Sequence, residues 1–315
     1  MKNLILLLVA ITFAIGCSKE NSNALEYQIG KNEFNIEVDD TLRNFLIHVP
    51  TNYTGDEAVP VVFMLHGSSG SGTKFYNISS WVQKSEEVGC IVVFPTGLEY
   101  PIVEKNNKMS TKWSSDGLVN DIPEGYPIKD DVPFINGLID LCDATFNIDK
   151  NRLYITGFSN GGAFVRTRVI QEMNDVFAAA NCSGGYGLPE VDVVSGRLLP
   201  IFAIIGSRDK NIIGNTETPE EIPLKAEEIL DHELYGLYLK NMLTTLELDA
   251  NNYTETSNPP KYNLITFTPK DENEENFYQL MIVNDMGHNY PNGSNNPQGV
   301  VAANHLWEWF MNYSL

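Results

Sequence analysis

Six short, almost uninterrupted apolar runs constrain the fold of this chain more than any other feature of its sequence. Each run is six to nine residues long, which suits a β-strand better than a helix. A strand that is apolar throughout, without alternating polar residues, is typical of a sheet that is buried on both faces. The runs are residues 59–67, 90–95, 152–157, 177–184, 199–206 and 277–283.

Segments with helical spacing lie between these runs. The clearest are residues 130–146, 161–173 and 300–315. Strand and helix therefore alternate along the chain, which predicts the α/β class, with a mostly parallel central sheet covered by helices on both faces. Residues 34–50 differ, because they alternate around a turn at Asp39 and Asp40, and we expect an antiparallel hairpin there.

The chain of 315 residues, 43 % of them hydrophobic, can bury a substantial core. No linker rich in proline or serine divides it after residue 30, so we predict one domain over residues 31–315. Within it, residues 221–260 look inserted. We expect an amphipathic helix over 223–242 and a loop over 251–261, and we interpret the insertion as a lid over a pocket.

The first residues predict export. Lys2 precedes an apolar stretch, residues 4–15, that is too short to span a bilayer comfortably but suits a signal peptide. The sequence "AIGCSKE" then resembles the lipobox of bacterial lipoproteins. We predict a lipoprotein signal peptide over 1–16, lipidation of Cys17, a lipid anchor to the membrane through that residue and a polar tether over 17–30. An ordinary signal peptide with an incidental cysteine is the alternative.

Charge and cysteine content narrow the possible partners. The 21 basic and 41 acidic residues give a net charge of −20, which repels phosphate backbones and argues against nucleic acid. Cys90 and Cys142 lie in apolar patterns, and one disulfide among Cys90, Cys142 and Cys182 stays open. The chain has no CxxC or HExxH motif and its five histidines are scattered, so we predict neither a metal site nor a cofactor.

The motif Gly-x-Ser-x-Gly at residues 157–161 joins a predicted strand to a predicted helix. In this context it is the signature of a nucleophile elbow, a tight turn with a crowded backbone that requires glycine on both sides of the serine. The turn places the hydroxyl of Ser159 at the carboxyl edge of the sheet, where open α/β folds bind their ligands. Ser159 is therefore the candidate nucleophile.

A serine nucleophile needs a histidine base and an acid that orients the base. His288 follows the last apolar run in a loop with glycine and proline, and Asp209 follows the run before it. We predict that these residues complete a Ser-His-Asp triad, in the chain order serine, acid, histidine. The other candidates for the base or the acid of the triad lie within helical segments or, in one case, three residues before His288. They are His232, His305, Asp231 and Asp285.

Acyl transfer also needs hydrogen-bond donors for the developing oxyanion. We expect the backbone N–H groups of Asn160 and Ser68 to supply them, the second from the loop "LHGSSGSG". We predict that His66 braces this loop by hydrogen bonding. We also place His66 and Tyr290 at the substrate pocket.

The motifs "LHGSSGSG", "FPTG", "GFSNGGAF", "GSRD" and "GHNYP" occur in the order and approximate spacing of a known group. They resemble the polyhydroxybutyrate depolymerase/feruloyl esterase group of α/β-hydrolases, sometimes described as prolyl oligopeptidase-like serine esterases. The resemblance covers most of residues 35–315, and residues 130–162 are its most specific part. It implies an α/β-hydrolase fold with Ser159 as nucleophile, Asp209 as acid and His288 as base.

Together with the predicted export signal and lipobox, the resemblance predicts a secreted, lipid-anchored serine esterase that needs no cofactor. We favour acetyl or feruloyl-type esters on plant polysaccharides, because no module for binding solid polyester is appended. A depolymerase of polyhydroxyalkanoate oligomers, a prolyl oligopeptidase-like peptidase and an inactive glycan-binding lipoprotein are the alternatives. The chain departs from the group at Ser68 and Ser69, where relatives often have cysteine or glycine, and at Tyr290, where many have tryptophan. These departures concern the substrate and leave the triad intact.

Overall fold

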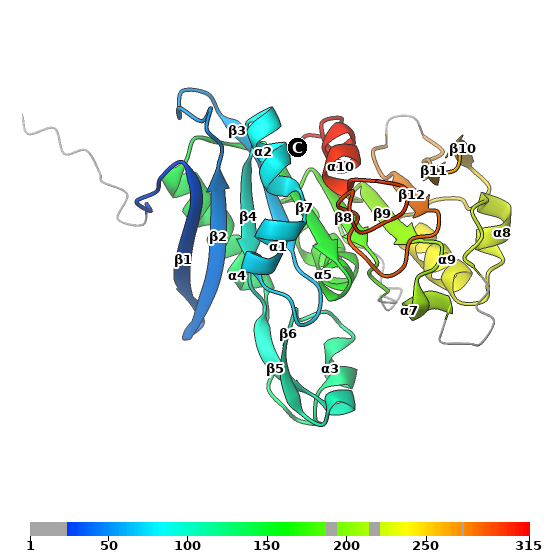
Figure 1. The fold of residues 1–315 in the computed structure, drawn as a ribbon, viewed down its shortest axis with the longest axis horizontal. Coiled ribbons are helices and arrows are strands. Elements are labelled where there is room, and N and C mark those ends of the chain that lie inside the picture. Colours follow the sequence, from blue (N-terminus) through cyan, green and yellow to red (C-terminus); the bar gives the residue numbers. More distant parts are fainter. Residues whose placement is uncertain (1–23, 187–193, 214–220, 272–273) are drawn as a thin grey trace, which may run out of the picture.

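The computed structural model describes residues 24–186, 194–213, 221–271 and 274–315 (Figure 1). Within these residues, ten strands form one sheet in the order β1-β2-β4-β3-β7-β8-β9-β12-β11-β10. The six central strands are parallel to one another and correspond to the six apolar runs, which confirms the predicted α/β fold. They are β4 (Ile91–Pro95), β3 (Val59–Leu65), β7 (Ile148–Phe158), β8 (Ala179–Ser183), β9 (Ile201–Gly206) and β12 (Tyr278–Val283).

Antiparallel strands extend the sheet at both edges. The predicted hairpin is present as β1 (Gly30–Val38) and β2 (Thr41–Val49), and β2 pairs with β4. At the other edge, β11 (Tyr262–Phe267) pairs with β12 and with β10 (Tyr253–Asn258). The predicted loop over 251–261 is therefore wrong. Most side chains of β10 are polar and exposed, so backbone pairing with β11 makes it a strand, and no apolar pattern marks it.

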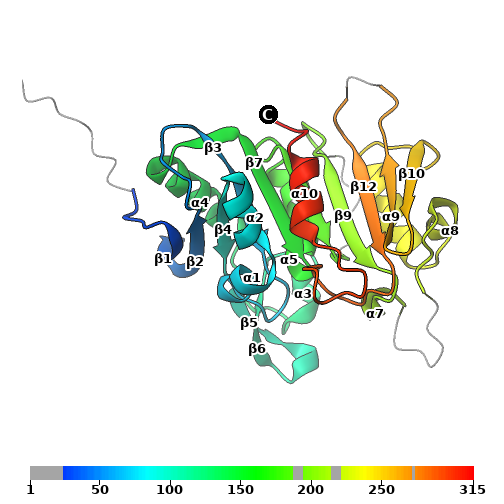
Figure 2. The same cartoon turned by 45° about the horizontal axis from the view of Figure 1, so that its top comes forward.

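The two faces of the sheet belong to separate cores, because side chains alternate along each strand. Val61, Phe63 and Leu65 face one core, whereas Val62 and Met64 face the other. Helices cover both faces, as Figure 2 shows. The first core contains side chains of α4 (Val132–Thr145), α5 (Asn160–Phe164), α6 (Ile170–Glu172), α7 (Lys210–Ile213), α8 (Ala226–Leu230) and α9 (Tyr235–Thr245). The second contains those of α1 (Gly72–Ile78), α2 (Trp81–Val88) and α10 (Ala302–Phe310).

Two local features modify this plan. A π-helical turn over Val165–Val169 joins α5 and α6, so one continuous helix follows Ser159 as the sequence predicts. The expected single helix over 223–242 is instead divided into α8 and α9 by a turn.

A protruding segment, residues 98–121, was not predicted. It contains β5 (Leu98–Ile102), a 3₁₀ turn (Val103–Lys105), β6 (Lys108–Lys112) and α3 (Leu118–Asp121). The strands β5 and β6 pair with each other in a separate two-stranded sheet. This segment extends away from the central sheet at the bottom of Figure 1. We call it the 98–121 excursion.

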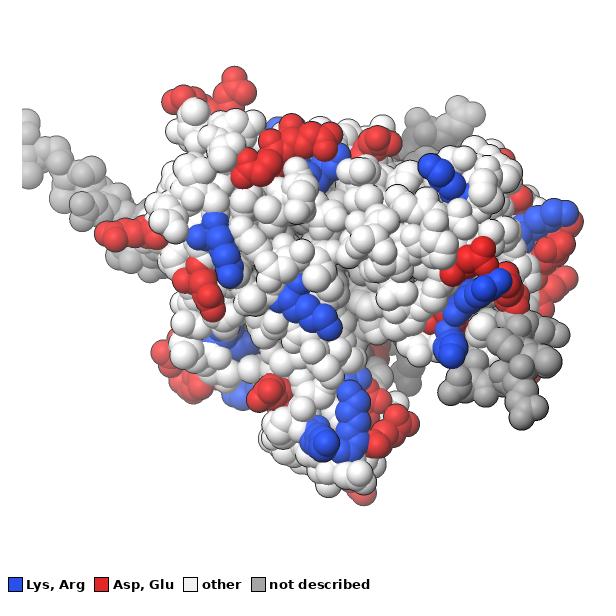
Figure 3. All heavy atoms as spheres, viewed as in Figure 1, with Lys and Arg blue, Asp and Glu red and all other residues white. Residues whose placement is uncertain are grey.

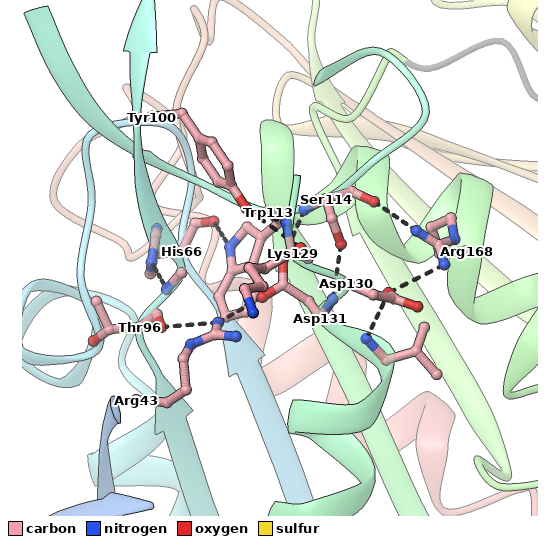
Figure 4. Close-up of polar contacts among 12 residues, drawn as sticks. Arg43, His66, Thr96, Tyr100, Trp113, Ser114, Lys129, Asp130, Asp131 and Arg168 are labelled. Atoms are coloured by element: carbon pink, nitrogen blue, oxygen red, sulfur yellow. Dashed lines mark hydrogen bonds and ion pairs between the residues drawn. The ribbon is translucent and has the colours of Figure 1, made fainter. Parts of the chain in front are cut away.

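A buried ion pair lies where the 98–121 excursion meets the domain. Arg43 of β2 pairs with Asp131 at the start of α4, and both side chains are almost fully buried (Figure 4). The guanidinium also lies 3.9 Å from the ring centroid of Phe134. Asp131 accepts a second hydrogen bond, 2.7 Å long, from the amide of Ser114, just beyond β6. The pair thus ties the returning chain of the excursion to the core.

The N-terminal predictions fall mostly outside the described residues. These are the signal peptide over 1–16, lipidation of Cys17 and most of the tether over 17–30. The last part of that tether packs on the domain, because the ring of Tyr27 lies 4.7 Å from that of Phe146. Along the described ranges, we find no helix with the length and apolar character that crossing a membrane requires. The three cysteines among which the sequence leaves a disulfide open are buried and form no disulfide. They are Cys90, Cys142 and Cys182.

We predict that Arg43→Met destabilises the domain by about 3–5 kcal/mol, because it leaves the carboxylate of Asp131 buried without its counter-ion. The matched control is Arg152→Met, which breaks a partly exposed pair with Asp149 and should cost less than about 1 kcal/mol. Urea unfolding of both variants gives the two free energies. Equal losses would show that burial does not set the strength of the Arg43 pair.

Candidate active site

The turn at Ser159 has the strained backbone that the motif predicts. Ser159 adopts φ 51° and ψ −117°, a conformation that residues with side chains seldom occupy. A Cβ atom at Gly157 would lie 2.3 Å from the carbonyl oxygen of Gly161, and one at Gly161 would lie 2.5 Å from that of His66. Both distances are too short for real contacts. Glycine is therefore required on each side of the serine.

The structure brings together the three residues predicted as a triad. Ser159 follows β7, Asp209 follows β9 and His288 follows β12, so all three lie at the carboxyl edge of the parallel strands. His288 Nε2 is 2.9 Å from Ser159 Oγ, and His288 Nδ1 is 2.8 Å from Asp209 Oδ2. With Asp209 ionised, the tautomer protonated at Nδ1 leaves Nε2 free to accept the serine proton.

Asp209 has a further donor that sequence reasoning missed. The hydroxyl of Tyr186 donates to Asp209 Oδ2, the same oxygen that faces His288. Burial, together with the carboxylate, raises the pKa of Tyr186, so its hydroxyl stays protonated. The amide of Asn211 donates to Oδ1 over 3.0 Å. The buried carboxylate is therefore fully hydrogen-bonded, although nothing in the sequence around Tyr186 signals this contact.

The two predicted oxyanion donors lie next to the serine. A Cβ atom at Gly67 would lie 3.1 Å from Ser159 Cβ, which places the Gly67–Ser68 peptide directly beside the nucleophile. Asn160 is the first residue of α5, where a helix leaves its N–H groups without an intrahelical acceptor. In the described part of the chain, neither the Ser68 nor the Asn160 amide donates to a backbone acceptor. Both are available to a ligand.

His66 is not a pocket residue, which corrects that part of the prediction. Its side chain is fully buried, with Nδ1 2.7 Å from the carbonyl oxygen of Gly67 and Nε2 accepting from the amide of Gly97 over 2.9 Å. It therefore braces the loop, as the sequence also suggested. Tyr290 is largely buried but does line the cavity, and its hydroxyl accepts a 2.8 Å hydrogen bond from the indole of Trp81.

A cavity of about 700 Å³ opens at Ser159 and His288. Aromatic rings of Phe75, Phe158 and Tyr290 form part of its wall. The 98–121 excursion forms another part, which the sequence did not predict. Its contributing residues are Ile102, Glu104, Lys105, Lys112 and Asp121.

The cavity does not share the strong negative charge of the chain. Lys74, Lys105 and Lys112 line it, against the carboxylates of Glu104 and Asp121. In Figure 3, basic side chains lie over α1 and on the 98–121 excursion. The net charge of −20 therefore does not describe the electrostatics of this site.

The predicted lid does not form the wall of this cavity. None of the described residues that line it comes from 221–260. The competing triad candidates also lie elsewhere. Asp285 pairs with Arg208, Asp231 is exposed near Lys240, His232 accepts the amide of Tyr235, and His305 packs on Tyr262.

A family model described as phospholipase/carboxylesterase matches residues 50–213, more than half of the chain. The chain belongs to this family. The matched region includes Ser159 and Asp209 but ends before His288. Membership in the phospholipase/carboxylesterase family agrees with the enzyme class predicted from the sequence, a serine hydrolase of carboxylic esters.

Two curated relatives are esterases. The chain is 25 % identical over 236 residues to the bifunctional acetylxylan esterase/xylanase XynS20E of Neocallimastix patriciarum, covering 73 % of this chain and 29 % of that protein. It is 28 % identical over 178 residues to feruloyl esterase B of Piromyces equi, covering 55 % and 30 % respectively. The chain thus spans less than a third of the length of either relative.

Solved structures support the fold. An S-formylglutathione hydrolase from Agrobacterium tumefaciens aligns with a TM-score of 0.56 at 14 % identity, covering 91 % of this chain and 97 % of that one. The acetyl xylan esterase from Aspergillus awamori aligns with a TM-score of 0.53 at 17 % identity, covering 89 % and 99 %. The poly(3-hydroxybutyrate) depolymerase LpqC from Bordetella parapertussis has a TM-score of 0.51 at 15 % identity, covering 83 % and 86 %.

We predict that Gly161→Ala destabilises the domain by about 1–3 kcal/mol, because the new methyl group would overlap the carbonyl oxygen of His66. Gly137→Ala in α4 is the matched control. Its Cβ would lie 3.5 Å from Ile36 Cδ1, an ordinary contact, so this change should stabilise the helix by about 0.5–1 kcal/mol. Thermal or urea unfolding measures both changes. A tolerated Gly161→Ala would contradict the close backbone contact.

The buried His66 predicts a loss of stability in mild acid. Burial lowers the pKa of His66 from 6.5 to about 4, so between these values the unfolded chain binds a proton that the folded chain does not. The contribution of neutral His66 to the free energy of unfolding is therefore complete above pH 6.5. It is lost as the pH falls towards 4, and the total loss is about 3 kcal/mol. His66→Gln, which cannot titrate, should lose less stability over this range. Parallel curves of unfolding free energy against pH for the two proteins would refute this role.

Proposed function

We propose that this chain is an exported serine esterase that hydrolyses acetyl or feruloyl-type esters on plant polysaccharides. The observation that carries the proposal is the hydrogen-bonded series Ser159, His288 and Asp209 at the wall of a cavity of about 700 Å³. Family membership and the two esterase relatives support the same chemistry.

In the proposed mechanism, His288 Nε2 takes the hydroxyl proton of Ser159 as Oγ bonds to the ester carbonyl carbon. The carbonyl oxygen becomes an oxyanion that accepts hydrogen bonds from the amides of Ser68 and Asn160. When the carbon–oxygen bond to the alcohol breaks, His288 returns the proton to the leaving oxygen. Water then attacks the acyl carbon while His288 takes a proton from the water. The bond between the acyl carbon and Ser159 Oγ breaks, His288 returns the proton to Oγ, and the carboxylic acid is released.

The acyl group is proposed from the cavity and the relatives together. Near Ser159, the ring centroids of Phe75 and Phe158 lie 6.1 Å apart, and the ring centroid of Tyr290 lies 6.1 Å from each of them. A hydroxycinnamoyl ring would pack against such a cluster in edge or offset geometry. An acetyl group needs much less of this surface, so acyl preference reports on whether the aromatic cluster is used.

Export and anchoring are part of the proposal. A signal peptide over 1–16 would direct secretion, and lipidation of Cys17 would hold the domain at the membrane surface through residues of the tether. The last residues before β1 contact the domain, since the amide of Leu25 donates to Thr145 Oγ1 over 3.0 Å. The free length of the tether is therefore shorter than residues 17–30.

We predict that Ser159→Ala lowers kcat/KM on esters by about 10⁶-fold and that Asp209→Asn lowers it by about 10⁴-fold, because the first removes the nucleophile and the second the oriented base. The measurement is a panel of acetyl, butyryl, feruloyl and peptide substrates. Ser257→Ala, the same chemical change on the edge strand β10, is the control and should keep wild-type activity.

The panel separates the alternatives. If the protein cleaves the peptide substrates but none of the esters, a peptidase replaces the proposed esterase. If it prefers hydroxybutyrate oligomers, a depolymerase replaces it. Full ester activity in Ser159→Ala would end the case for an acyl-enzyme at this serine.

A further inference from the structure

One tryptophan connects the two backbone segments that carry the proposed oxyanion donors. We infer that Trp113 and the side chain of Asn160 are positioning residues that hold the amides of Ser68 and Asn160 in fixed relation to each other. This inference rests on the proposed function, because it concerns the oxyanion site of that reaction. Sequence reasoning assigned no role to Trp113 and used only the backbone of Asn160.

The indole of Trp113 fixes the loop after β3. Its Nε1 donates to the carbonyl oxygen of His66 over 2.8 Å, and its ring lies 5.0 Å from the imidazole (Figure 4). Trp113 is fully buried, so water does not compete for this hydrogen bond. His66 directly precedes the Gly67–Ser68 peptide. The indole therefore restrains the backbone that carries the Ser68 amide.

The same residue fixes the other donor. The backbone amide of Trp113 donates to Asn160 Oδ1 over 2.6 Å. Asn160 Nδ2 in turn donates to Ser115 Oγ over 3.1 Å and to the carbonyl oxygen of Trp113 over 3.4 Å. Asn160 therefore has its side chain bound to residues 113–115, while its backbone amide is the first N–H of α5. Both donor segments are held by one short stretch of chain.

That stretch is itself anchored in the core. Asp131 accepts from the Ser114 amide over 2.7 Å, and the Asp131 amide donates to Ser114 Oγ over 2.9 Å. Arg43 holds the carboxylate of Asp131 from the other side (Figure 4). The buried ion pair therefore orients residues 113–115, and these residues orient both amides.

Such an arrangement has a catalytic consequence beyond stability. Donors stabilise an oxyanion only if they already point at the position where charge develops, and a misplacement of about 1 Å can cost on the order of 10²-fold in rate. Trp113→Phe keeps an aromatic ring but removes the indole N–H together with part of the fused ring system. A control with the same loss of ring atoms elsewhere is therefore needed to separate the hydrogen bond to His66 from packing.

We expect Trp113→Phe to lower kcat per titrated active site by about 10- to 100-fold, with KM unchanged within about twofold. Affinity for a trifluoromethyl ketone, which forms an oxyanion on Ser159, should fall by the same factor as kcat/KM. Trp309→Phe is the matched control, because it makes the same substitution at another buried tryptophan, in α10, and none of the described residues that line the cavity belongs to that helix. It should keep kcat and the ketone affinity near wild type.

A second variant guards against a folding defect in the first. Asn160→Ala keeps the backbone amide and removes the side-chain bonds to residues 113–115, and it should also lower kcat and ketone affinity by about 10-fold or more. Because both substitutions disturb one arrangement, the fold-loss of kcat in the double variant should be smaller than the product of the two single fold-losses. A fold-loss equal to that product would show independent effects and would overturn the shared role.

Wild-type kcat and ketone affinity in both folded variants would overturn the inference, as would a loss of active sites with normal turnover per remaining site. Failure of the proposed function gives a different result. It appears in the wild-type protein as absence of ester hydrolysis, before any variant of Trp113 or Asn160 is measured.

Discussion

A direct contact between two pieces of backbone underlies the whole site. β3 and β7 are neighbouring parallel strands, and at their carboxyl ends the turn after β7 packs closely on the loop after β3, backbone against backbone at Gly161. Gly161 lies against the carbonyl oxygen of His66, and Gly67 lies against Ser159. The strained φ of Ser159 is maintained because its neighbours on both sides leave no room for relaxation.

The central sheet and the meeting of Ser159, Asp209 and His288 at one of its edges could be predicted from local sequence. The six apolar runs became the six parallel strands because burial on both faces demands apolar side chains throughout. Ser159 is marked by its glycines, and Asp209 and His288 follow strands whose ends meet at one edge. These features depend on short stretches of sequence and on the general geometry of parallel sheets.

The remaining parts depend on contacts between residues far apart in sequence. β5 and β6 carry proline, charged and hydroxyl residues with no clear alternation, and their pairing gives the 98–121 excursion a form that no local pattern predicts. Trp113 reaches His66 and Asn160, and Tyr186 reaches Asp209, through hydrogen bonds that only the folded arrangement defines. The same holds for β10, whose polar residues are strand-forming only beside β11. His66 was misplaced for a related reason, since motif position does not reveal which way an imidazole points.

The 98–121 excursion has two ends with different neighbours. Its outer part supplies Ile102, Glu104 and Lys105 to the cavity, whereas the residues just beyond β6, next to the cavity-lining Lys112, are fastened to Asp131 and contact the serine turn. Insertions or exchanges at the outer end would reshape the surface that meets a substrate without loosening the inner end. For the proposed esterase, selectivity and turnover could therefore diverge independently during evolution, although a single excursion of the chain would serve both.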